Sequence, residues 1–158
     1  MNRSAVMKNG FLYSLANILT LCVVILGVSS YFIYHTHYIG LIIFLLGALC
    51  LASLIPFKVK IQNIWPDIVF GLIDNGILAI MAIFGGEIGG VMGAVIGGTV
   101  GNAVTDGIAG IFEGWISENT KNPNINRQRT MLGSSVGKMS GCLLGAGIVL
   151  IIANVFKL

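Results

Sequence analysis

Long apolar stretches separated by short polar connections dominate the chain. Five of these stretches approach or exceed the roughly 20 residues that a helix needs to cross a bilayer. They cover residues 11–34, 38–57, 64–84, 88–116 and 131–156. The pattern predicts an all-α integral membrane protein with about five transmembrane helices.

The boundary between the third and fourth stretches depends on a glycine-rich segment. Residues 85–90 read Gly-Gly-Glu-Ile-Gly-Gly, and four glycines with one charge favour a turn. Without a turn there, about 50 residues would form one helix, which is far too long for a single crossing. We therefore expect the chain to reverse within residues 85–90.

Composition supports the membrane assignment. The chain has 158 residues, 9% of them charged, and a mean hydropathy of +0.92, whereas soluble domains carry roughly 25% charged residues. The net charge of +3 is small and the basic residues lie mostly at segment ends, which argues against a nucleic-acid partner. The three cysteines lie in apolar runs without a C-x-x-C pair, so no redox or organic cofactor is expected.

Basic residues set the expected orientation. Seven of them fall on one side of five crossings: Arg3, Lys8, Lys58, Lys60, Lys121, Arg127 and Arg129. Lys and Arg accumulate on the cytoplasmic side, which predicts a cytoplasmic N-terminus and a C-terminus outside. The short N-terminal segment favours a prokaryotic plasma membrane, with the mitochondrial inner membrane as the alternative.

The chain divides into two expected regions. Residues 1–62 form an N-terminal two-helix membrane hairpin, and residues 63–158 form a C-terminal three-helix region that carries the acidic residues within spans. Rows of glycine at every fourth position, such as 85, 89, 93, 97 and 101, let helices approach closely. These rows predict close packing of the C-terminal three helices and also a homodimer.

Polar residues lie deep within the third and fourth stretches. A carboxylate at a span centre costs about 2.5–3.5 kcal/mol on insertion scales, so such residues are functional candidates. Asp74 and Asp106 each lie ten residues from the inner end of their stretch, and we expect them to face one another. Their polar neighbours are Asn75, Asn102 and Thr105.

A hard cation suits this set of oxygens, because Ca²⁺ takes 6–8 oxygen ligands and Na⁺ uses a subset. Asp74 and Asp106 are the expected metal ligands. Asp67 and Glu113 are paired in the same way nearer the inner surface, which predicts an ion pathway. Alternatively, a buried acid pairs with Lys138 or accepts hydrogen bonds from the serines 134, 135 and 140, without any transport.

Three stretches resemble the transmembrane protein sixty-five family, a mitochondrial inner-membrane family linked to sodium/calcium exchange. They are Gly71-Leu-Ile-Asp-Asn-Gly-Ile, Gly101-Asn-Ala-Val-Thr-Asp-Gly-Ile-Ala-Gly and Leu132-Gly-Ser-Ser-Val-Gly-Lys-Met-Ser-Gly-Cys-Leu-Leu-Gly. The resemblance covers about residues 66 to 150 and implies that Asp74, Asn75, Asn102 and Asp106 lie in an ion pathway. It also implies Na⁺ and Ca²⁺ as the transported ions. The sequence departs from the family pattern at Lys138 and in its first two stretches.

The expected function is therefore secondary-active cation transport by Na⁺/Ca²⁺ exchange. No nucleophile, phosphate-loop or H-E-x-x-H motif is present, so an enzyme is not expected. Two alternatives remain open, a glycine-zipper membrane assembly or scaffold protein and a passive cation channel.

Overall fold

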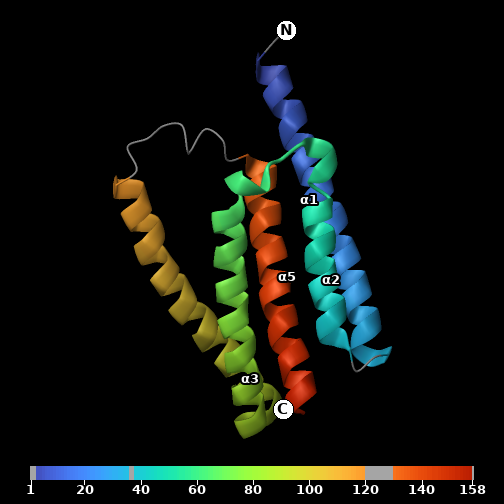
Figure 1. Ribbon diagram of the computed structural model, residues 1–158, viewed down its shortest axis with the longest axis vertical. Coiled ribbons are helices and arrows are strands. Elements are labelled where there is room, and N and C mark those ends of the chain that lie inside the picture. The colour runs from blue at the N-terminus through green and yellow to red at the C-terminus, as the bar shows by residue number, and fades with distance from the viewer. Residues whose placement is uncertain (1–2, 36–37, 120–129, 158) are drawn as a thin grey trace.

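The computed structural model describes residues 3–35, 38–119 and 130–157, with side chains at 10–35, 38–111 and 130–157. These residues are helical with short connections, and no strand occurs among them. The elements are α1 (Arg3–His35), α2 (Ile39–Ala52), η1 (Ile55–Phe57), η2 (Ile61–Asn63), α3 (Trp65–Asn119) and α5 (Met131–Phe156) (Figure 1). The all-α prediction is confirmed.

Within the described part of the chain, four helical segments are long and apolar enough to cross a membrane. They are Gly10–His35, Ile39–Phe57, Trp65–Ile111 and Met131–Phe156. The last has the same bounds as its predicted stretch. The second is not one regular helix, because α2 ends at Ala52 and a 3-10 turn with Pro56 in its first positions follows. Proline has no backbone N–H to continue the α-helical ladder.

α3 reverses direction near its middle. Gly89 has φ −125° and ψ 16°, and Gly90 has φ 60° and ψ −142°. Gly90 takes a positive φ that residues with a Cβ rarely adopt. Figure 1 shows the helix running to one end of the molecule and returning. We name residues 65–88 the first limb and residues 91–119 the second limb. The chain thus turns inside the predicted glycine-rich segment.

The two limbs touch closely beside the turn. A Cβ on Gly93 would overlap the carbonyl oxygen of Gly85, and a Cβ on Gly97 would overlap that of Met81. Further along, a Cβ on Gly101 would stand 3.2 Å from the Cα of Leu78. Small side chains allow such backbone contact. The limbs then diverge toward their other ends (Figure 1).

α5 lies between the first limb of α3 and α2 (Figure 1). On one side, a Cβ on Gly141 or Gly145 would overlap a carbonyl oxygen of the first limb. On the other side, Ser140 Oγ donates a 2.8 Å hydrogen bond to the carbonyl oxygen of Gly47 in α2. α5 is therefore the central helix of the described structure.

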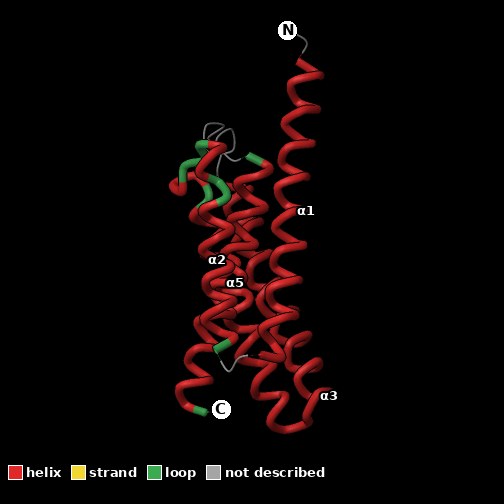
Figure 2. Tube along the Cα trace, turned by 90° about the vertical axis from the view of Figure 1, so that its right-hand side faces the viewer, coloured by secondary structure: helices red, strands yellow, loops and turns green. Residues whose placement is uncertain are grey.

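α1 packs more loosely than α2 or α5. Leu21 is its one buried residue among positions 10–35, and it joins a core that includes Cys50, Ile64, Leu132 and Val136. The first turns of α1 extend past the other helices (Figure 2). Most of its apolar side chains face outward, as is suitable for a helix surrounded by lipid.

Candidate functional site

Asp74 is one of two buried acids on the first limb, and Asp67 is the other. Asp74 lies nine residues into α3, and its side chain is 9% exposed. The hydroxyl of Thr105, on the second limb, donates a hydrogen bond to Asp74 Oδ1. Thr105 is itself buried. Two residues 31 positions apart therefore meet at an interface between the limbs, in the middle of an apolar helix pair.

The Thr105 hydroxyl is also close to its own helix. Its oxygen lies 3.1 Å from the carbonyl oxygen of Gly101 and 3.0 Å from that of Asn102. A hydroxyl has one proton, and an ionised carboxylate accepts but cannot donate. With Asp74 ionised, Thr105 donates to it while keeping lone pairs available to a cation.

Asp106 lies on a different face from Thr105. Successive residues of an α-helix are about 100° apart, and Asp106 is exposed while Thr105 is buried. Asn102 Nδ2 donates a 2.9 Å hydrogen bond to Asp106 Oδ2. The expected site residues thus form two hydrogen-bonded pairs, Asp74 with Thr105 and Asp106 with Asn102. Asn75 is half-buried beside Asp74.

Asp67 is the most deeply buried acid, at 1% exposure. Ser134 Oγ donates a 3.0 Å hydrogen bond to its Oδ1, and a Cβ on Gly137 would stand 3.1 Å from its Cβ. Asp67 therefore faces α5. Glu113, its expected partner, has a side chain outside the described residues. The limbs have separated at this end of α3 (Figure 1).

Lys138 lies close to the same region. Its Nζ is 5.0 Å from the ring centroid of Phe70, a distance at which a cation is attracted to an aromatic face. Of the serines weighed as neutralising groups, Ser134 bonds Asp67 and Ser140 bonds Gly47. For Asp74, the described hydrogen-bond donor is Thr105.

Oxygen atoms of mixed kinds dominate this region. Among the side chains that the structure describes, no three His, Cys, Asp or Glu residues gather as a metal-holding group. One carboxylate, one hydroxyl and nearby backbone carbonyls surround the meeting point of the limbs. Such a set offers a single negative charge and several neutral oxygens, which suits Na⁺ directly and Ca²⁺ with additional ligands.

Sequence reasoning placed Thr105 among the candidates but missed that it, and not Asp106, faces Asp74. Ser134 was among the serines expected to satisfy a buried acid, and it bonds Asp67. The position of Thr105 could have been predicted in part from its spacing. Gly97, Gly101 and Thr105 lie four residues apart and therefore share one face of the second limb. Comparison with protein-family models, with curated proteins and with solved structures finds no match to this chain.

Proposed function

We propose that this chain is an integral membrane cation transporter whose ion site is centred on Asp74. The supporting observation is the buried Asp74 carboxylate, bonded to Thr105 across the two limbs of one apolar helix. A carboxylate in this position is costly in a bilayer and is typical of an ion pathway. A bound cation would offset that cost when the ion replaces its water shell with protein oxygens.

The residues have distinct roles in this proposal. Asp74 supplies the charge that binds the cation, and Thr105 supplies a hydroxyl oxygen from the opposite limb. Asn75, Asn102 and Asp106 complete the coordination when the limbs close further around the ion. Asp67, bonded to Ser134, lies on the path from the side of the membrane where α3 begins.

The proposed topology has five crossings, because the two limbs of α3 each traverse the bilayer. The N-terminus is then cytoplasmic and the C-terminus outside, in a prokaryotic plasma membrane. The reversal at Gly89 and Gly90 supports this topology. A cysteine at Ile88, which is 88% exposed next to the turn, should react with a membrane-impermeant thiol reagent added from outside.

Na⁺ and Ca²⁺ are the proposed ions, on the basis of the sequence resemblance. The test is Ca²⁺ flux in proteoliposomes with an imposed Na⁺ gradient, comparing wild type with Asp74→Asn. Flux that follows the gradient and disappears in the variant would support the exchanger. Ca²⁺ flux that ignores the Na⁺ gradient would contradict exchange, and large single-channel currents would indicate a passive channel.

The close glycine contacts favour a second candidate, a glycine-zipper assembly protein. Gly85, Gly93 and Gly97 bring helix backbones into direct contact, and such contacts also drive helix association without transport. The two candidates differ at Asp74, since an assembly protein should keep its function when Asp74 becomes Asn. Gly97→Leu should disturb the packing of the two limbs in either candidate, because a Cβ there would overlap the carbonyl oxygen of Met81.

A homodimer through the second limb is part of the proposal. Asp106 is exposed on the second limb, and its neighbours Val104 and Ile108 are apolar and also exposed. A carboxylate exposed to lipid is energetically unfavourable. A second copy packed there would shield it. Val104→Cys on a background without Cys22, Cys50 and Cys142 should form disulfide-linked dimers in the membrane. Val69→Cys, on the first limb, is the control and should not.

A further inference from the structure

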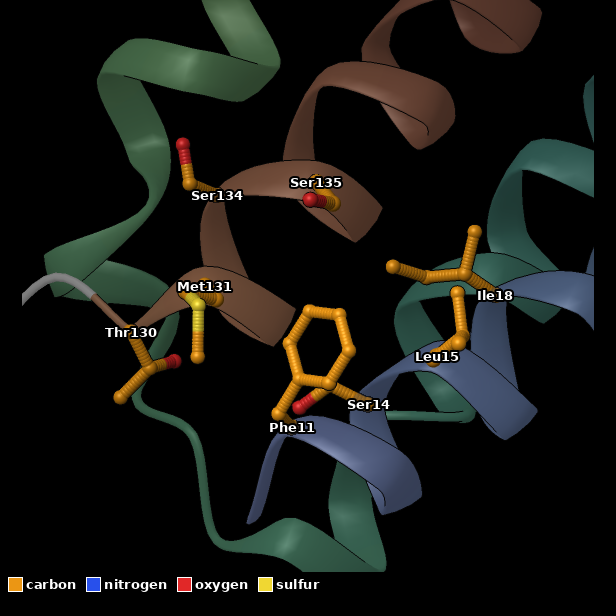
Figure 3. Close-up of a pocket in the computed structure, with 8 residues that line it drawn as sticks. All are labelled: Phe11, Ser14, Leu15, Ile18, Thr130, Met131, Ser134 and Ser135. Atoms are coloured by element: carbon orange, nitrogen blue, oxygen red, sulfur yellow. The ribbon is translucent and has the colours of Figure 1, made fainter. Parts of the chain in front are cut away.

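A side pocket lies between residues 11–18 of α1 and the start of α5. It has a volume of about 520 Å³ and opens to the side of the molecule. Eight residues line it: Phe11, Ser14, Leu15, Ile18, Thr130, Met131, Ser134 and Ser135. Figure 3 shows the Phe11 ring in the middle of the opening, between the two helices. The proposed ion site does not include this pocket.

Its depth in the membrane follows from the helix bounds. Phe11 is the second residue of the candidate span Gly10–His35, and Met131 is the first residue of the candidate span Met131–Phe156. At 1.5 Å per residue, Ser14 and Ser135 lie about 6 Å inside these ends and Ile18 about 12 Å inside. The pocket therefore begins at the boundary between headgroups and hydrocarbon and extends part of the way into one leaflet.

Polar and apolar side chains line the pocket together. The hydroxyls of Ser14, Thr130 and Ser135 lie beside the apolar side chains of Phe11, Leu15 and Met131, and Ile18 lies deepest. The hydroxyl of Ser134 points away from the pocket toward α3, where it bonds Asp67 (Figure 3). A ligand with a polar end and an apolar chain matches this arrangement.

Positive charge lies beside the polar end. Lys58 and Lys60 are exposed on the connection before α3, and Val59 between them contacts α5, with its Cγ1 3.1 Å from where a Cβ on Gly133 would stand. Lysines at the membrane surface attract anionic headgroups. Since α1 is held by few buried side chains, an occupant of the pocket would also fill the space between α1 and α5.

We propose that this pocket binds one anionic phospholipid. Its phosphate lies toward Lys58 and Lys60, its ester oxygens accept hydrogen bonds from the hydroxyls of Thr130 and Ser135, and one acyl chain lies along Leu15 and Ile18. The bound lipid would join α1 to α5, on the opposite side of Ser134 from Asp67. The inference does not depend on transport, and it holds equally for an assembly protein.

Native mass spectrometry tests this site. The full chain is purified from membranes containing equal phosphatidylglycerol and phosphatidylcholine, and the retained lipid is identified by its mass, which also separates a phospholipid from free phosphate. We expect wild type to retain one phosphatidylglycerol. Leu15→Trp should abolish retention by filling the pocket, whereas Val23→Trp, on the same helix at a 71% exposed position, should not.

A second variant remains informative if Leu15→Trp fails to fold. Lys58→Gln combined with Lys60→Gln changes only exposed residues and should lower the preference for phosphatidylglycerol by about fivefold per lysine. The proposal is overturned if wild type retains no lipid, or retains phosphatidylcholine equally. An unchanged preference in the lysine variant would also overturn it, as would equal retention by Leu15→Trp and Val23→Trp.

Discussion

The two limbs of α3 have similar compositions but different surroundings. The first limb packs against α5, where Gly71, Gly141 and Gly145 bring backbones into contact. The second limb contacts the first from the turn as far as Thr105, whereas no atom outside its own helix lies within 4 Å of a Cβ on Gly107 or Gly110. A glycine in these helices therefore allows close backbone contact only where a second helix packs against it.

The same contrast separates the two acids. Asp74 on the first limb is buried and bonded to Thr105, whereas Asp106 on the second limb is exposed and bonded within its own helix to Asn102. A span-centre aspartate is thus a candidate whose role depends on the helix face it occupies.

Gly141→Leu should have the largest effect on stability. Its side chain would overlap the Ile68 carbonyl oxygen on the first limb, and overpacking of this severity should cost more than about 3 kcal/mol. The matched control is Gly107→Leu on the second limb, which we expect to leave monomer stability unchanged. Thermal unfolding in a detergent that keeps the chain monomeric measures both. Equal losses would contradict the difference between the limbs.

Asp74→Asn should lower cation flux about a hundredfold, because a loss of about 3 kcal/mol weakens binding by that factor. Asp106→Asn should lower flux only about tenfold, since Asp106 is exposed in the structure and reaches the site only when the limbs close. Flux in proteoliposomes, normalised to folded protein, measures both. If both variants lose flux equally, both carboxylates hold the ion at the same time.

Thr105→Val should weaken the link between the limbs. It removes the donor to a buried carboxylate, and hydrogen bonds to charged groups contribute about 1.5–3 kcal/mol. Thr105→Ser keeps the hydroxyl and should restore stability. Thr99→Val is the control, because the Thr99 hydroxyl is exposed and bonds only Val95 in its own helix. Unfolding midpoints that fall equally for Thr99→Val and Thr105→Val would contradict the assigned bond.

Ser140→Ala should have the smallest effect. It removes one hydrogen bond to the Gly47 carbonyl, and interhelical hydrogen bonds in membranes average about 0.6 kcal/mol. The backbone contacts of Gly47 and Gly147 with neighbouring helices remain. A shift in unfolding larger than that of Gly141→Leu would show that hydrogen bonds, and not close glycine contacts, hold the packed side of the molecule together.

Much of the fold could be predicted from sequence, because length and hydropathy suffice to place helices in a bilayer. Met131–Phe156 matches its predicted range, and the turn falls at Gly89 and Gly90 inside the predicted segment. The internal break of the second stretch was missed, although Pro56 signals it. No residue pattern within α5 predicts its central position, because that position depends on which helices pack together.

The candidate site was only partly predictable. The depth of a residue along a helix follows from counting residues. That count correctly predicted that the region around Asp74 lies level with the region around Thr105. The direction in which a side chain points around the helix is harder to predict than its depth, because a shift of one residue rotates the side chain by about 100°. That rotation exchanges Asp106 for Thr105 as the neighbour of Asp74.

Composition and residue order alone were enough to predict that this protein is helical, apolar enough for a membrane and turned back within residues 85–90. Those properties depend on local composition and backbone conformation. Only the tertiary structure decided that Asp74 meets Thr105, that Ser134 bonds Asp67 and that a pocket remains between α1 and α5. These contacts depend on how rigid helices rotate and approach one another, which residue spacing along one helix does not specify.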